Sequence, residues 1–439
     1  MDKLDEPDRH PTPGHLSAFG RGRLSRRRSR EVVRHLLTDC ATCRQAAERI
    51  PCYGEAFHRS WLEVERRQES LALERAAAPE LLRELLAQTG ERQWEMVAQE
   101  PRFQTWTLCE LLLDASRDWG FQSPARALEL SQLGIDVAMR LDPAVYGETR
   151  VNDLFARAWV TLGNAQRIRS DFAAAEKSFG QAERLLKQGT GDPLEKAHLL
   201  LHRASFLGNQ QRFSEAFRLL DRVASIARRC DDAQLHGKAL ITRGFLLGIA
   251  HDPEAAIRYL AAGIRKLDTV SDPRLLVAAH HNLTLYLTES GRYREALGLL
   301  ENARPLYHQV GDQMSLIRLR WLEGKIAAAL GQFLEAEELL KGVRQELIER
   351  ELGFDTALLS LDLADVYIRQ GRSAEMRRLA EEMIPIFRSR DIHRESLAAL
   401  LTFQKAAEME SVTLGLIREV SGYLKESRAA SSLRSREPR

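Results

Sequence analysis

The sequence repeats one short turn signature, and its clearest copy is residues 291–296, GRYREA. Related copies stand at residues 171–175 (DFAAA), 212–216 (RFSEA), 331–336 (GQFLEA) and 371–376 (GRSAEM), with a weaker one at 251–256 (HDPEAA). Phe172 and Phe213 stand 41 positions apart, and Tyr293 and Phe333 stand 40 positions apart. A nearly constant period of this length indicates an array of similar structural units.

Each unit has the residues that a pair of packed helices needs. A glycine follows the first helix in three copies, where a left-handed cap is expected, at Gly291, Gly331 and Gly371. In the weaker copy Pro253 is expected to open the second helix, because the first helical position tolerates a missing N–H. A small residue is expected where the two helices cross closely, at Gly163, Ala204, Gly244, Gly324 and Ala364.

These units resemble tetratricopeptide repeats. The best copy follows the small-and-large pattern of that family at Trp159, Leu162, Gly163, Phe172, Ala175, Phe179 and Ala182. The resemblance covers about residues 155–410, and the period of about 40 residues is longer than the usual ~34. It implies an all-α fold, a right-handed α-solenoid of helix pairs, and a protein that binds other proteins or peptides.

The chain divides into five segments. Residues 155–425 are expected to form the solenoid, and residues 51–154 read as further helices that are either degenerate repeats or a cap. Residues 15–50 are expected to form a small separate module. Residues 1–14 and the Ser/Arg-rich residues 426–439 are expected to be disordered.

In repeats of this kind the first helices line the inner face, so their non-packing residues are the candidates for binding. Aligning the copies on their aromatic residue gives Arg157, Asn164, Arg167, His198, Lys238, Phe245, His281, Arg318, Trp321 and Lys325. Cations pair with carboxylates and aromatic side chains give desolvated contact, so this set predicts a groove for an extended acidic peptide. The alternative is that the aromatic residues pack between repeats and the cations are ordinary surface.

The segment 35–44, HLLTDCATCR, contains two cysteines at a spacing that can bind one tetrahedral Zn²⁺. With the preceding helix it resembles the small zinc-binding anti-sigma domain of bacteria. The resemblance implies His35, Cys40 and Cys43 as ligands, and His10 or alternatively His15 as the first ligand. Here four residues separate the histidine from the first cysteine, where that domain has three. The alternative is that both cysteines are small apolar residues of a loop.

Six arginines lie close together near the N-terminus, at Arg21, Arg23, Arg26, Arg27, Arg28 and Arg30. Such a cluster can contact nucleic-acid phosphates or an acidic protein surface, or it can be the solvated start of a helix. Because the formal net charge is only +2 and no aromatic residues are interleaved, the sequence favours protein over nucleic acid as the partner.

Composition excludes several other classes of protein. No stretch approaches the ~18 apolar residues of a membrane span, and the acidic, Pro-rich start lacks the apolar core of a secretory signal. Phosphate-binding loops, H-E-x-x-H and G-x-S-x-G are all absent. We therefore expect a cytoplasmic, non-enzymatic bacterial regulatory adaptor whose partner is a peptide or protein such as a sigma factor or another regulator. A self-assembling or chaperone-like scaffold with a vestigial zinc module is the alternative, and the oligomeric state stays open.

Overall fold

The computed structural model describes residues 10–20, 23–24, 28, 32, 42, 55–120, 123–268, 272–387, 403–404, 406–407 and 412–434. The chain forms two compact units, Met1–Gln88 and Thr89–Arg439. The described residues form helices and no strands, which confirms the predicted all-α class. None of the described helices is long and apolar enough to cross a membrane.

The first unit contains two described helices. The first is short, α1 (Pro13–Gly20), and the second is long, α4 (Glu55–Leu86). Pro79 stands inside α4, where it removes one backbone hydrogen bond. The sequence predicts helix from residue 51, and α4 begins four residues later.

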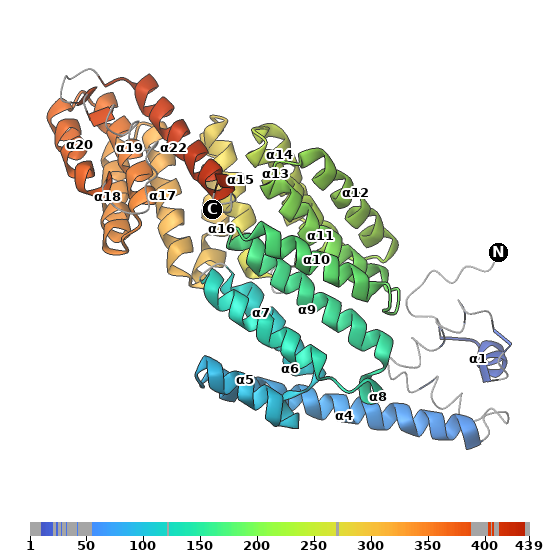
Figure 1. Ribbon diagram of the computed structural model, residues 1–439. Helices are drawn as coiled ribbons and strands as arrows, with labels where there is room; N and C mark the ends of the chain where they lie inside the picture. The colour runs from blue at the N-terminus through green and yellow to red at the C-terminus, as the bar shows by residue number, and fades with distance from the viewer. Residues whose placement is uncertain are drawn as a thin grey trace. The chain divides into compact units, whose positions relative to one another are not determined.

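The second unit opens with α5 (Gly90–Gln99), a 3-10 turn (Pro101–Phe103), α6 (Trp106–Trp119), α7 (Pro124–Met139) and the short α8 (Pro143–Tyr146). Six helix pairs follow: α9 (Glu148–Ile168) with α10 (Phe172–Leu186), α11 (Pro193–Asn209) with α12 (Phe213–Arg229), α13 (Ala233–Ile249) with α14 (Pro253–Ile264), α15 (Pro273–Glu289) with α16 (Tyr293–Val310), α17 (Gln313–Ala329) with α18 (Phe333–Glu349), and α19 (Gly353–Arg369) with α20 (Ser373–Phe387). Figure 1 shows these pairs following one another through the unit. They confirm the predicted solenoid of tetratricopeptide-like helix pairs.

The turns between the paired helices adopt the predicted left-handed backbone. The φ angles of Gly291, Gly331 and Gly371 are +74°, +80° and +69°. Other copies place a side chain in the same conformation, as at Gln211 with φ +59° and His251 with φ +60°. The turn signature therefore fixes the backbone even where glycine is replaced, at a cost of roughly 1–2 kcal/mol per non-glycine residue.

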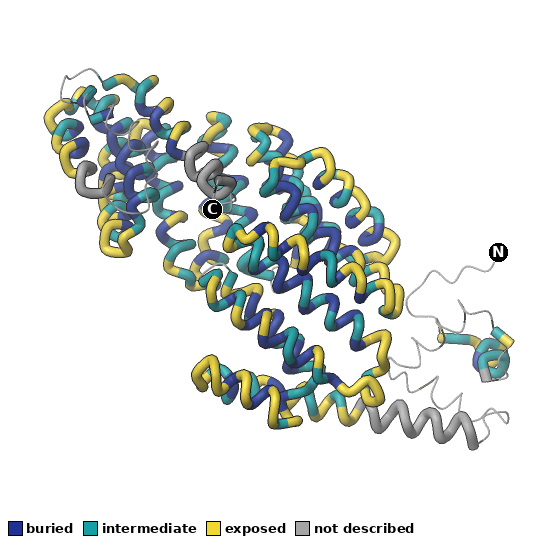
Figure 2. The backbone as a smooth tube through the Cα atoms, viewed as in Figure 1, coloured by how far each residue is buried: buried dark blue, intermediate teal, exposed yellow. Residues whose placement is uncertain are grey.

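The small residues of the first helices lie where the second helices cross them. A Cβ added at Gly163 would stand 2.8 Å from the ring of Phe179, and one added at Gly244 would stand 2.6 Å from Leu260 Cγ. At Gly324 it would stand 2.9 Å from Leu340. Ala204 is fully buried as well. Figure 2 shows buried residues along the facing sides of the helices, and these residues form the core of the array.

The first helix of each pair contacts the first helix of the next pair. In order along the chain α6, α9, α11, α13, α15, α17 and α19 each contact the next, whereas the second helices lie mainly against the helices of their own and the following pair. The first helices therefore form an inner layer and the second helices an outer one. The residues of the predicted groove belong to helices of this inner layer.

The last described helix is α22 (Leu414–Arg434), which contacts α19. The sequence predicts a disordered tail from residue 426, and the helix extends eight residues past that point, to Arg434. The local composition explains the difference, because Ala, Leu, Glu and Arg are good helix formers.

Candidate interaction surfaces

The ten residues of the predicted groove all lie on first helices. Arg157, Asn164 and Arg167 are on α9 and His198 is on α11. The remaining six are Lys238 and Phe245 on α13, His281 on α15, and Arg318, Trp321 and Lys325 on α17. Arg318 is exposed, and the others are partly buried.

Most of the inner cations are paired with carboxylates of the neighbouring first helices. Arg157 on α9 is hydrogen-bonded to Glu110 on α6 at 2.9 Å and to Glu195 on α11. Hydrogen bonds to Glu195 and Glu110 and their negative charges raise the pKa of Arg157, against the effect of burial. Lys238 Nζ lies 2.9 Å from Asp272 Oδ2 at the start of α15. These pairs balance much of the positive charge that the sequence predicted for the inner face.

Asp362 of α19 makes the same kind of contact with two residues of α17. Its Oδ2 accepts a hydrogen bond from Trp321 Nε1 at 2.7 Å, and its Oδ1 lies 3.6 Å from Lys325 Nζ. Trp321 also packs against the neighbouring apolar core, and Phe245 packs against the core of α13 to α16. Both aromatic side chains thus have structural contacts, as the alternative to the groove prediction proposes.

Arg167 differs from the other inner cations. Its Nε donates to Asn164 Oδ1 at 3.0 Å, and its Nη1 donates to Asn209 Oδ1 at 2.8 Å. Among the described residues no carboxylate forms an ion pair with it. Burial lowers its pKa to about 10, so the side chain is still charged at neutral pH. A desolvated guanidinium bonded only to neutral amides keeps an uncompensated charge.

Two histidines lie on α11, and the second of them, His202, is close enough to Arg167 to be affected by its charge. Burial lowers the pKa of His198 to about 4 and that of His202 to about 3, and nearby Arg157, Arg167, Arg117 and Lys238 contribute. Both imidazoles are therefore neutral at pH 7, each with one N–H donor and one acceptor nitrogen. A cavity of about 310 Å³ reaches them, lined by Glu110, Leu113, Asp114, Arg117, Arg157, Val160, Thr161, His198 and His202.

The described residues around this cavity lack an activated nucleophile. Cys109 on α6 is fully buried, its Sγ donates to the carbonyl of Gly134 at 3.4 Å, and burial strongly raises its pKa. A buried, protonated thiol is inert. The inner face carries side chains that can hold polar and acidic groups by hydrogen bonds and charge.

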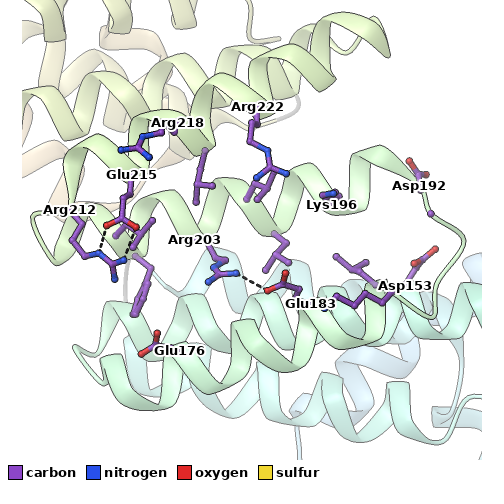
Figure 3. A pocket seen from close by; sticks show the side chains of 18 residues that line it. Asp153, Glu176, Glu183, Asp192, Lys196, Arg203, Arg212, Glu215, Arg218 and Arg222 are labelled. Atoms are coloured by element: carbon purple, nitrogen blue, oxygen red, sulfur yellow. Dashed lines mark hydrogen bonds and ion pairs between the residues drawn. The ribbon is translucent and has the colours of Figure 1, made fainter.

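A second concave surface lies on the outer side of the same repeats (Figure 3). It is a groove of about 710 Å³ between α10 and α12, with α11 beneath them. Its floor includes Leu199, Phe206 and Leu207, which are buried. Charged side chains from all three helices surround this floor. No residue of this groove was among the sequence candidates, because pairs of second helices carry no motif that marks the space between them.

Most of the predicted metal site lies outside the described residues. His35, Cys40 and Cys43 belong to that part, as do Arg21, Arg26, Arg27 and Arg30 of the basic cluster. His10, Arg23 and Arg28 are described. Among the described residues no group of three or more potential metal ligands occurs. The zinc site and the basic cluster therefore stay predictions from the sequence.

Comparison with known proteins gives a likeness of fold. No protein-family model matches the chain, and no curated protein matches its sequence. A signal transduction ATPase with numerous domains and a tetratricopeptide repeat sensor, from Pyrococcus horikoshii, matches with a TM-score of 0.56 and 13% identity. The match covers 81% of this chain and 52% of that protein, so the chain spans about half of its length.

Two further solved structures have lower scores. Aspartyl phosphate phosphatase F from Bacillus subtilis matches with a TM-score of 0.47 and 13% identity, over 89% of this chain and 97% of that one. RapI in its apo form matches with a TM-score of 0.45 and 12% identity, over 64% and 97% of the two chains. At such identities the likeness to the Pyrococcus protein concerns the fold alone: this chain is an α-solenoid of tetratricopeptide-like helix pairs.

Proposed function

We propose that this chain is a non-enzymatic protein-interaction scaffold that binds an acidic peptide or protein segment on its inner face, at Arg167. The observation that carries the proposal is the partly buried guanidinium of Arg167, which is bonded to the amide oxygens of Asn164 and Asn209 and not to a carboxylate. A carboxylate of a ligand would supply the missing opposite charge. Charge-assisted hydrogen bonds of this kind contribute about 1.5–3 kcal/mol.

The surroundings of Arg167 support a peptide as the ligand. Asn164, Asn209 and the neutral imidazole of His202 offer both donors and acceptors, which is what the amide groups of an extended chain require. The cations on either side are already paired, so they do not compete for the ligand carboxylate. The repeats of the Pyrococcus neighbour are described as a sensor, which agrees with a recognition role.

Substitution of Arg167 tests this proposal. Peptides are selected from a phage-displayed random library on the wild-type protein, and their affinity is measured by isothermal titration calorimetry. We expect Arg167→Gln to weaken binding at least tenfold, because the glutamine keeps a hydrogen-bond donor but removes the charge. Arg320→Gln is the matched control: Arg320 of α17 is paired with Glu346 of α18, outside both the inner-face candidates and the outer groove, and its loss should leave affinity within twofold. Failure to select any peptide, or equal affinity of both variants, would contradict the proposal.

We also propose that the N-terminal segment binds zinc and contacts a bacterial regulator, with a sigma factor as the first candidate. The support is the sequence pattern of His35, Cys40 and Cys43, with His10 as the fourth candidate ligand. Such a module would make the chain a cytoplasmic regulatory adaptor.

Zinc content of the purified full-length protein tests this part. We expect one zinc ion per chain by inductively coupled plasma mass spectrometry, and its loss on double substitution of Cys40→Ser and Cys43→Ser. The control is Cys230→Ser, because Cys230 is an exposed residue at the end of α12. Protein that contains no metal before any substitution would rule out the zinc module and favour the alternative of a scaffold with a vestigial N-terminus.

A further inference from the structure

The groove between α10 and α12 has glutamates on its α10 side and mainly arginines on its α12 side (Figure 3). On its floor Arg203 of α11 donates to Glu183 of α10 at 2.9 Å. On the α12 side Arg212 and Glu215 share two hydrogen bonds of 2.7 Å. Both of these acidic residues are therefore already occupied within the protein.

Four exposed cations at the groove have no such partner among the described residues, and Lys187 at the end of α10 is one of them. The other three are Lys196 of α11 and Arg218 and Arg222 of α12, which likewise form no ion pair with any carboxylate of the described residues. Arg218 lies close to Glu215, but the pKa of Glu215 is lowered chiefly by its hydrogen bond to Arg212 and only secondarily by Arg218. The groove thus presents unbalanced positive charge along α12.

Apolar side chains continue from the floor onto the walls. Leu186 near the end of α10 and Leu219 on α12 line the groove and are only partly buried, beside the buried Leu199 and Leu207. Part of the apolar lining is therefore accessible to a ligand. Removing such surface from water contributes about 25 cal/mol per Å².

We propose that this outer groove is a second docking site, which takes an extended acidic segment of a partner protein that also carries leucine-like side chains. Arg218 and Arg222 are four residues apart on one helix face, which places them about 6 Å apart. Alternate residues of an extended chain have nearly the same spacing, about 6.6 Å. Two carboxylates at alternate positions can therefore meet the two arginines, while the residue between them points away from α12 towards the apolar floor.

The carboxylates at the groove favour a protein over a nucleic acid. Glu176 and the ion-paired Glu183 and Glu215 stand along the same walls, so the positive charge is not continuous enough to follow a phosphate backbone. A peptide instead places separate carboxylates at the arginines and uncharged side chains beside the glutamates. The site is on the opposite side of the repeats from Arg167, so it is independent of the inner-face proposal.

The test uses the full-length protein and a fluorescein-labelled twelve-residue peptide in which glutamate alternates with leucine and serine. Fluorescence anisotropy is expected to show saturable binding that weakens about tenfold on double substitution of Arg218→Gln and Arg222→Gln, since two ion pairs with the peptide are lost. The matched control removes two arginines from the same helix outside the groove, by Arg228→Gln and Arg229→Gln, and should change affinity less than twofold. Arg167→Gln should have no effect.

Three outcomes would overturn the proposal. Equal weakening by the groove and control variants would mean that α12 attracts the peptide only by its overall charge. Equal affinity for a polyglutamate peptide of the same length would remove the role of the apolar floor. Tighter binding of a heparin fragment with the same dependence on Arg218 and Arg222 would assign the groove to a polyanion instead.

Discussion

Replacing Gly244 with leucine is expected to separate α13 from α14 and to lower the free energy of unfolding of these repeats by about 3 kcal/mol or more. A Cβ at this position would stand 2.6 Å from Leu260 Cγ and 3.1 Å from the backbone nitrogen of Leu260. A flexible side chain could move away, but the backbone of α14 cannot move without opening the helix pair. Hydrogen exchange measured by mass spectrometry reports the opening of α13 and α14 separately from the rest of the chain.

Gly298 on α16 is the matched control for this substitution. It is also a helical glycine, but no atom lies within 4 Å of a Cβ added there. Gly298→Leu should therefore leave stability unchanged or raise it by up to ~1 kcal/mol, because glycine is a poor helix former. Similar effects of the two substitutions would show that helix propensity, and not the close approach of α13 and α14, decides the result.

Acidification from pH 7 to pH 5 is expected to destabilise the inner layer of helices. In the folded protein the pKa of His202 is about 3, and those of His198 and His281 are about 4, mainly because of burial. An unfolded histidine has a pKa near 6.5, so below that pH the unfolded state binds more protons and stability falls with falling pH. For His202 the loss between pH 7 and pH 5 is about 2 kcal/mol.

The measurement is the free energy of unfolding by urea at several pH values between 7 and 5, followed by circular dichroism. His202→Gln should reduce the pH dependence by about 2 kcal/mol over this range. The control is His308→Gln, since His308 is exposed on α16. A pH dependence that is the same in wild type and in His202→Gln would exclude His202 as its source.

The fold could be read from the sequence because its determinants are local. The turn glycines and small residues such as Gly163 and Gly324 recur at a fixed spacing, and each has the predicted place in the structure. In a repeat protein every unit contacts only its neighbours, so a local pattern determines most of the packing. The predicted groove residues likewise all lie on first helices.

The sequence could not show in the same way which cations of the inner face are paired with carboxylates. Lys238 and Lys325 look like free cations in a single repeat, and their partners Asp272 and Asp362 are 34 and 37 residues further along the chain. A search for a carboxylate about one period after each inner cation would have found them. In the sequence Arg167 looks like these lysines. Only the structure shows that its partners are asparagines and not carboxylates. The outer groove between α10 and α12 could not be predicted, because the repeat signature that opens both helices does not specify the distance between them or the side chains that line the space.

The inner ion pairs also have a mechanical consequence. Arg157 with Glu195 connects α9 to α11, Lys238 with Asp272 connects α13 to α15, and Asp362 connects α17 to α19. By contrast α13 meets α11 through the apolar contact of Leu246 with Gly208, which has no preferred direction and allows sliding. Bending between two first helices that are joined in this way requires an ion pair or a hydrogen bond to break, so the array is expected to bend more easily where first helices meet through apolar contacts.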